Sequence, residues 1–180
     1  MIKLETNRLE IISGTLGHIR TEIDNRILFA ELLNAEVPDN WPPPLNDEES
    51  QNYFLKYAEA HPDPEGYSFW YIILRDGIKR NLIGGIGFKG EPSEDGTIEI
   101  GYSIMESHQR NGYASEAVAA LVKWAFDREN VVRVIAETLD DGIFSQKVLI
   151  KNGFQSIGLG SEAGITRYEL KKEIYTKFSR

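Results

Sequence analysis

The sequence predicts a mixed α/β (α+β) fold, in which strands and helices interleave along one chain. Residues 97–104 alternate apolar and polar side chains with the period of a strand, and a helix-forming segment follows from about Tyr113. Residues 131–138 form a β-branched run, and residues 143–152 then favour a short helix. Two such strand-then-helix units are typical of a sheet with helices packed on it.

The N-terminal half carries weaker signals of the same two kinds. Residues 4–13 predict a strand, and isoleucines and leucines at helical spacing predict one helix from about Gly17 to about Leu33. Residues 37–45 hold three consecutive prolines and predict irregular backbone. Asn46 is the expected N-cap of the next helix, with Glu49 completing a capping box.

The remaining elements are strands. Two runs, 68–74 and 82–88, flank the turn at Asp76-Gly77 and predict a hairpin. Gly153 is the residue type that ends a helix in the left-handed conformation, and residues 154–171 hold two short strands, the second at 165–170. Because no repeat, low-complexity segment or linker interrupts the pattern, we expect residues 1–180 to be a single domain.

Residues 97–120 form the most informative stretch. The strand leads through a polar turn into the helix, and the pattern Gln109-x-x-Gly112-x-Ala114 lies at the junction. The first turn of a helix has N–H groups without intrahelical partners and the positive end of the helix dipole, so it attracts phosphate. Small residues such as Gly112 let a pyrophosphate approach the backbone. An ordinary glycine turn before an amphipathic helix is the alternative.

Composition excludes several classes of function. The formal net charge of −8 and a pI near 5.0 argue against a nucleic-acid partner, because phosphate backbones bind clustered Lys and Arg. The absence of cysteine excludes disulfides and thiolate zinc sites, and three scattered histidines do not suggest a metal centre. The charged N-terminus and the lack of a long apolar run predict a cytoplasmic protein with no membrane segment.

A second glycine pattern suggests a different cofactor. Residues 85–90, GIGFKG, satisfy the G-x-G-x-x-G fingerprint and follow a strand. That fingerprint also needs a helix that begins within it, whereas residues 91–96 predict a turn between strands. We therefore reject a dinucleotide-dependent dehydrogenase and expect the glycines to serve close packing or a bulge.

Several segments together resemble one family. Residues 97–120 resemble motif A of the GNAT superfamily of acyl-CoA-dependent N-acyltransferases, with its Q/R-x-x-G-x-G/A loop. Residues 136–154 resemble motif B of the RimJ/RimL-like branch, and residues 4–9, LETNRL, resemble that branch's opening strand. The resemblance implies a mixed, mostly antiparallel sheet of about seven strands with about four helices.

It also implies acetyl transfer from acetyl-CoA to a primary amine, by direct attack in a ternary complex. By resemblance, Glu99 is the general base, acting through water, and Ser145 is the proton donor to the leaving thiolate. A salt-bridged strand residue and a helix-capping serine are the respective alternatives. The coenzyme is expected on the strand end and the turn after it, along Tyr102, Ser103, Ile104, Gln109, Arg110, Asn111, Gly112, Tyr113, Ala114 and Ser115.

The chain departs from the family pattern at one coenzyme contact. The asparagine that usually stands three residues before the motif B serine is Gly142, and Phe144 replaces a commonly small residue. The departure leaves a second function open, a non-catalytic acyl-CoA sensor or subunit on the same fold. Retention of Glu99 and Ser145 opposes that alternative.

The acceptor cannot be named from these residues. It is a protein N-terminal amine or a small amine, and the negative net charge favours a cationic one. Trp41, Tyr53 and Tyr57 are the candidate acceptor contacts, because this region covers the acceptor side in GNAT folds. A tryptophan buried in the core is the alternative for Trp41. A homodimer is left open.

Overall fold

The computed structural model describes residues 1–44, 46–61 and 65–178. One eight-stranded sheet forms the centre, with the strand order β1-β2-β3-β4-β5-β6-β8-β7. All neighbouring strands pair antiparallel except β5 and β6, which are parallel. The strands are β1 (Lys3–Glu5), β2 (Leu9–Ser13), β3 (Phe69–Asp76), β4 (Lys79–Phe88), β5 (Thr97–Ile104), β6 (Arg133–Leu139), β7 (Gln155–Leu159) and β8 (Ile165–Lys171).

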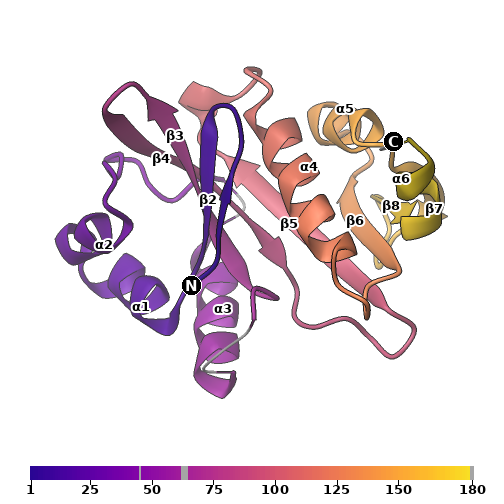
Figure 1. The fold of residues 1–180 in the computed structure, drawn as a ribbon, viewed down its shortest axis with the longest axis horizontal. Helices are drawn as coiled ribbons and strands as arrows, with labels where there is room; N and C mark the ends of the chain where they lie inside the picture. Colours follow the sequence, from indigo (N-terminus) through magenta and orange to yellow (C-terminus); the bar gives the residue numbers. More distant parts are fainter. Residues whose placement is uncertain (45, 62–64, 179–180) are drawn as a thin grey trace.

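Six α-helices in the described residues cover this sheet. Figure 1 shows α1 and α2 beside the β1–β4 end, and α5 and α6 beside β6, β7 and β8. The helices are α1 (Leu16–Asp24), α2 (Arg26–Leu33), α3 (Glu48–Ala60), α4 (Tyr113–Phe126), α5 (Ile143–Lys151) and α6 (Lys172–Phe178), with a short 3-10 helix at Glu106–His108. The mixed, mostly antiparallel architecture predicted from the sequence is confirmed, with eight strands and six helices in place of about seven and four.

The sheet separates two hydrophobic cores. Trp70 and Ile72 on β3 pack with the buried side of α4, whereas Tyr71 and Ile73 pack with Phe29 of α2 on the other face. This alternation follows from the period of two in a strand. On β5, the residues in the α4 core are Ile98, Ile100, Tyr102 and Ile104. Glu99, Gly101 and Ser103 therefore lie on the face that α1, α2 and α3 cover.

Three predicted element boundaries were wrong. The strand predicted over residues 4–13 is a hairpin, because Thr6 forms a turn in which its Oγ1 accepts from the Leu9 N–H at 2.9 Å. The helix predicted over 17–33 is broken at Asn25, whose side chain accepts from the Leu28 N–H at 3.1 Å and caps α2. Asp47, not Asn46, caps α3 by accepting from the Ser50 N–H. Helix α6 was not predicted.

The glycines of β4 serve close packing, as expected. A Cβ on Gly85 would lie 2.1 Å from the Phe69 ring, and one on Gly87 would lie 2.5 Å from the Ser68 carbonyl oxygen. Residues 89–96 then connect β4 to its antiparallel neighbour β5 and open no helix. The rejection of a dinucleotide fingerprint is therefore confirmed.

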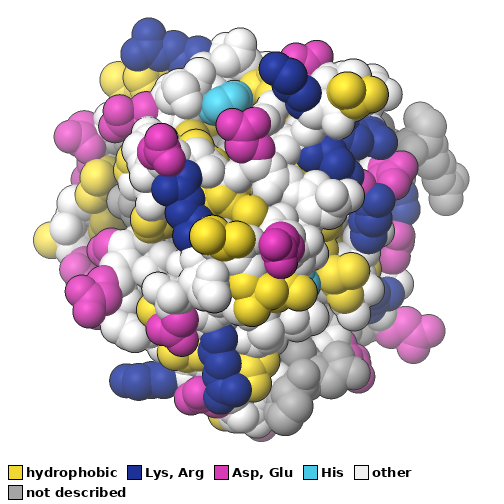
Figure 2. Space-filling model, turned by 90° about the vertical axis from the view of Figure 1, so that its left-hand side faces the viewer, with side chains coloured by type: hydrophobic (Ala, Val, Ile, Leu, Met, Phe, Trp, Pro, Cys, Tyr) yellow, Lys and Arg dark blue, Asp and Glu magenta, His cyan; other side chains and the backbone are white. Residues whose placement is uncertain are grey.

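Apolar side chains also reach the surface of α1 and α2. Ile23, Ile27, Leu28 and Leu32 are all exposed, and Figure 2 shows apolar side chains gathered on the side of the molecule that carries these helices. Patches of this kind mark interaction sites in many proteins. The homodimer left open by the sequence stays a prediction.

Candidate active site

The site begins where β5 and β6 part. The two strands pair only from Thr97↔Arg133 to Glu99↔Ile135, although β5 continues to Ile104 and β6 to Leu139. Parallel strands pair along their length in most sheets, so the early end of this ladder leaves one edge of β5 open. The opening lies next to the first turn of α4 and the start of α5 in sequence.

Backbone register decides which groups of β5 face the opening. The Glu99 carbonyl accepts from Lys89 at 3.0 Å, and the Met105 N–H donates to Ile83 at 2.8 Å, so the odd-numbered residues direct their backbone groups toward β4. The N–H and C=O groups of Tyr102 and Ile104 consequently point to the open edge. Ser103, which was expected to contact the coenzyme, directs its backbone groups to β4 instead.

The turn after β5 is held in a defined shape. Gln109 donates from its side-chain amide to the Ile104 carbonyl at 3.0 Å, and Asn111 donates to the carbonyls of His108 (3.2 Å) and Gln109 (3.0 Å). Arg110 and Gly112 have positive φ angles of 63° and 81°. This left-handed backbone turns the chain into α4, and it favours glycine at position 112.

Helix α4 begins with amides that no side chain caps. Gly112 occupies the N-cap position, and the first intrahelical bond runs from the Glu116 N–H to the Gly112 carbonyl at 3.1 Å. The N–H groups of Tyr113, Ala114 and Ser115 precede that bond, so the helix leaves them without an intrahelical partner. Together with the helix dipole they form an anion site on an exposed loop.

The hairpin of β1 and β2 supports this loop from behind. Arg8 donates to the Asn111 carbonyl at 2.9 Å and forms an ion pair with Glu116 at 2.7 Å, and Thr6 also donates to Glu116. Burial raises the pKa of the Glu116 carboxyl, but the hydrogen bonds from Thr6 and Arg8 outweigh burial and lower it overall. The carboxylate therefore stays ionised at neutral pH and keeps Arg8 on the loop.

Glu99 lies at the point where the strands separate, on the face opposite the α4 core. Lys89 forms an ion pair with its carboxylate, and 21% of the Glu99 side chain is exposed. Tyr57 of α3 lies near the connection between β4 and β5 that carries Lys89, since a Cβ on Gly90 would lie 3.3 Å from the Tyr57 ring. A partly exposed carboxylate at the opening has the access that a general base needs.

Ser145 and Tyr102 form a pair across the opening. The Tyr102 hydroxyl on β5 lies 3.0 Å from Ser145 Oγ and 3.1 Å from the Ser145 carbonyl in the first turn of α5. Burial raises the pKa of Tyr102 to about 12, with a smaller opposing effect from the Ser145 hydrogen bond. The phenol thus stays protonated at neutral pH. It can donate a hydrogen bond to Ser145 but cannot act as a base.

This pair yields a prediction. If Ser145 supplies a proton to a leaving group, then Tyr102→Phe should lower kcat by about 10-fold, less than loss of a direct proton donor, because Tyr102 acts through Ser145. Turnover with acetyl-CoA and an acceptor amine measures this, and Tyr67→Phe is the matched control, since Tyr67 bonds Asn130 away from the opening. Equal kcat values for the two variants would assign Tyr102 to packing.

Gly142 adopts a turn that no larger residue fits. A Cβ there would lie 2.6 Å from Thr138 Oγ1 and 2.9 Å from the Leu139 carbonyl oxygen. The loop after β6 thus closes on its own strand where the family carries asparagine. Beside it, Phe144 is 63% exposed, and the Arg110 guanidinium lies 5.2 Å from its ring centroid.

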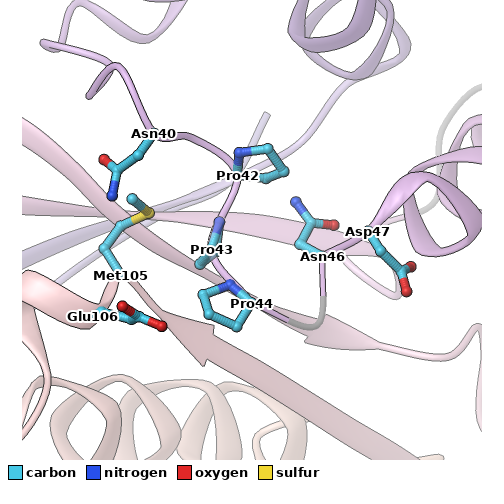
Figure 3. Close-up of a pocket in the computed structure, with 8 residues that line it drawn as sticks. All are labelled: Asn40, Pro42, Pro43, Pro44, Asn46, Asp47, Met105 and Glu106. Atoms are coloured by element: carbon cyan, nitrogen blue, oxygen red, sulfur yellow. The ribbon is translucent and has the colours of Figure 1, made fainter.

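A pocket of about 410 Å³ lies on the α1–α3 side, between residues 37–44, which we call the proline-rich segment, and the residues that follow β5. We call it the 40–47/105–106 pocket. Figure 3 shows that the Glu106 side chain extends toward Pro44. Its lining residues are Asn40, Pro42, Pro43, Pro44, Asn46, Asp47, Met105 and Glu106.

The three expected acceptor residues are not among the lining residues of this pocket. Trp41 packs its ring against Phe29 and Tyr71, with ring centroids 6.3 and 6.5 Å apart, at the edge of the second core. Tyr53 and Tyr57 stack on each other along α3, with centroids 6.5 Å apart, and Tyr53 is exposed. The pocket therefore does not bring these three side chains together.

The relatives of this chain identify its family. The family model for the acetyltransferase (GNAT) domain matches residues 15–155. The chain belongs to the GNAT acetyltransferases. It is 36% identical over 158 residues, covering 86% of this chain, to the uncharacterized N-acetyltransferase YjdG of Bacillus subtilis (strain 168), of which 90% is covered.

Other relatives support the RimJ/RimL-like branch. The chain is 30% identical over 115 residues to the ribosomal-protein-serine acetyltransferase of Escherichia coli (strain K12), covering 64% of this chain and 62% of that protein. The fold matches RimL, a ribosomal L7/L12 alpha-N-protein acetyltransferase solved with coenzyme A, with a TM-score of 0.66 at 19% identity over 94% and 98% of the two chains. The chain is thus a GNAT N-acetyltransferase with sequence similarity to a member of this branch.

Three polar residues of this GNAT site escaped sequence reasoning. Arg8 was placed within a continuous strand, Tyr102 was considered only for its backbone, and Glu22 was not considered. Each acts on a residue far away in the chain, and Glu22 accepts a hydrogen bond from the Trp41 indole 19 residues on. The Arg8–Glu116 ion pair and the Tyr102–Ser145 hydrogen bond could have been predicted only if the order of the strands in the sheet had been known.

Within 1–44, 46–61 and 65–178, no group of three or more His, Cys, Asp and Glu side chains is arranged to hold a metal ion. No helix in this part of the chain is long and apolar enough to span a membrane.

Proposed function

We propose that this GNAT protein transfers the acetyl group of acetyl-CoA to a cationic primary amine, with a peptide N-terminal amine as the first candidate. One observation carries the proposal. The open edge of β5 leads directly to the uncapped N-terminus of α4, so amide-binding and pyrophosphate-binding backbone groups follow one another in space. Coenzyme A presents amides in its pantetheine arm and a pyrophosphate beyond them.

The residues present fit the coenzyme. The pantetheine amides would pair with the backbone groups of Tyr102 and with the Ile104 N–H, since the Ile104 carbonyl is engaged by Gln109. The pyrophosphate would bind the amides of the turn from Arg110 to Ser115. Gly112 leaves the approach open, with only an Arg8 nitrogen at 3.5 Å from the position of a Cβ. When bound, acetyl-CoA supplies the activated acyl group.

The chain's own groups then carry the proton transfers. The Glu99 carboxylate takes the proton of the acceptor amine through a water molecule, so that the neutral nitrogen forms the new C–N bond as the C–S bond breaks. Backbone N–H groups at the open edge stabilise negative charge on the carbonyl oxygen. Ser145, held by Tyr102, donates a proton to the leaving sulfur, and the second proton lost by the nitrogen restores the serine hydroxyl through water.

Charge supports a cationic acceptor. Among the described residues that line it, the 40–47/105–106 pocket has the carboxylates of Asp47 and Glu106 and no Lys, Arg or His. The backbone hydrogen bond from Ser50 is the main cause that lowers the pKa of Asp47, so this carboxylate is ionised at neutral pH. The Escherichia coli relative is named for a ribosomal protein, which favours peptides over small amines as the first class to test.

Two measurements test the proposed function. Calorimetry with acetyl-CoA should show binding, and thiol release should depend on an added amine in a panel of basic peptides, neutral peptides and polyamines. Fastest release with peptides that carry a basic residue near a free N-terminus is the expected result. Binding without thiol release for any amine would favour the sensor alternative, and absence of binding would overturn the proposal.

A variant of the pocket tests the acceptor's charge. Glu106→Gln should raise the KM for a cationic acceptor by about 2- to 5-fold, the range of an exposed charge pair, and salt should reduce the difference. Glu49→Gln, on the exposed first turn of α3 and outside the pocket lining, is the matched control. A KM that stays equal in both variants would remove Glu106 from acceptor binding.

A further inference from the structure

Glu22 on α1 makes more hydrogen bonds than any purely local role requires. Its Oε1 accepts from Trp41 Nε1 at 2.9 Å, Asn46 Nδ2 at 3.2 Å and Gln51 Nε2 at 3.2 Å. Its Oε2 accepts from the Tyr71 hydroxyl at 2.6 Å. One carboxylate thereby joins α1, the proline-rich segment, α3 and β3.

These bonds hold the wall of the 40–47/105–106 pocket. Trp41 lies between the lining residues Asn40 and Pro42, and Asn46 is itself a lining residue. The segment has a further attachment between them, where the Ser103 hydroxyl of β5 donates to the Pro44 carbonyl. Glu22 thus holds the segment through Trp41 and also bonds Asn46 just beyond it, and Ser103 of β5 holds the segment through Pro44. These attachments fix the backbone that lines the pocket.

The chemistry of the cluster indicates that Glu22 fixes the positions of the residues that donate to it. Burying a carboxylate is costly, and well-packed apolar residues often replace buried ionic groups without loss of stability. Burial has the largest effect and raises the pKa of Glu22 overall, although the hydrogen bonds from Tyr71, Trp41, Gln51 and Asn46 each lower it. A side chain that only filled space could be apolar, whereas three donors from two separate segments can share one oxygen only in a defined geometry.

We propose that Glu22 is a positioning residue for the acceptor, which fixes the proline-rich segment so that the pocket presents the amine to the thioester. This inference rests on the proposed function. It assigns Glu22 no contact with either substrate, because both of its oxygens are already engaged by protein donors.

Two substitutions separate position from charge. Glu22→Leu fills the space but accepts no hydrogen bond, and it should lower kcat/KM for the acceptor by about 10- to 100-fold, as misplacement of a substrate by an ångström does. Glu22→Gln keeps one oxygen for Trp41, Asn46 and Gln51, and its amide can donate to the Tyr71 oxygen. It should restore most of the acceptor kcat/KM. The KM for acetyl-CoA should stay unchanged in both.

The matched control is Glu59→Gln. Glu59 on α3 pairs with Arg20 on α1 at 2.9 Å, so it also joins these two helices, but it does not reach the proline-rich segment. This variant should keep both kinetic constants. Trp41→Phe retains an aromatic ring but removes one donor, and it should lower acceptor kcat/KM by about 2- to 10-fold.

A spectroscopic readout reports the segment without activity. The chain has three tryptophans, so its amide spectrum should contain three indole N–H signals, and Trp41→Phe assigns that of Trp41. Glu22→Leu should shift this signal alone, and Glu22→Gln should leave it near its wild-type position. A shift in all three signals would indicate a general structural change and would overturn the inference.

Kinetic outcomes complete the test. A folded Glu22→Leu variant with wild-type acceptor kcat/KM would overturn the positioning role, and so would an equal loss for acceptor and acetyl-CoA. Failure of the proposed function is distinct, because it would be seen in the wild-type protein as no thiol release with any amine.

Discussion

Glu99→Gln is expected to lower turnover by about 10²- to 10⁴-fold, the range that a positioned general base contributes. Glutamine keeps the shape and the hydrogen bonding of the side chain but cannot take a proton. The carboxylate lies where β5 and β6 separate, partly exposed and paired with Lys89, and it is on the same face as the proposed acceptor pocket. Acetyl-CoA affinity should barely change, because the proposed coenzyme contacts are backbone groups.

Steady-state thiol release and calorimetry measure the two effects. Glu5→Gln is the control, since Glu5 also pairs with cationic side chains but lies on β1 at the far edge of the sheet. At higher pH more of the acceptor amine is neutral, so the defect of Glu99→Gln should shrink as pH rises. Wild-type turnover of Glu99→Gln at neutral pH would assign Glu99 to structure and leave the amine to lose its proton unaided.

The central elements could be predicted because their signals are local. β5 spans Thr97–Ile104 as predicted, since its apolar residues alternate on a sheet with a core on one face. The start of α4 at Tyr113 follows from Gly112, which has the left-handed conformation that the turn needs. Gly153 likewise ends α5 with φ at 86°.

The break in the N-terminal strand was not predicted, because the residues that form it make contacts far along the chain as well as their local turn. Residues 4–13 have a continuous strand pattern, but Thr6 and Arg8 lie in a turn and donate hydrogen bonds to Glu116, which is more than 100 residues away. The turn before α4 was therefore predicted from the sequence, but the contacts of Thr6 and Arg8 with Glu116 that support it were not. The same holds for Ser145, whose partner Tyr102 is 43 residues distant.

The acceptor side was predicted least well, since its side chains form networks rather than motifs. Trp41 was singled out as a substrate contact, yet its indole N–H is engaged by Glu22 and its ring packs at the edge of a core. No periodicity links Glu22 to Trp41, Asn46 and Gln51. Only the folded positions of α1, α3 and the proline-rich segment bring these residues together.

Gly112→Asn is expected to weaken acetyl-CoA binding by about 100-fold or more while the protein stays folded. Charge-assisted hydrogen bonds contribute roughly 1.5–3 kcal/mol each, so loss of two amide contacts to the pyrophosphate accounts for that change. Asparagine tolerates the left-handed conformation seen at φ 81°. Valine does not, and it should in addition lower the free energy of unfolding by about 1–2 kcal/mol.

The control for Gly112→Asn is Gly77→Asn. Gly77, in the β3–β4 turn, has φ at 59° and no atom within 4 Å of a Cβ, so asparagine there tests the cost of a left-handed side chain far from the loop. Calorimetric Kd values and thermal unfolding should be measured for both variants. If Gly112→Asn is folded and binds acetyl-CoA as the wild type does, then the pyrophosphate does not lie on the amides that begin α4.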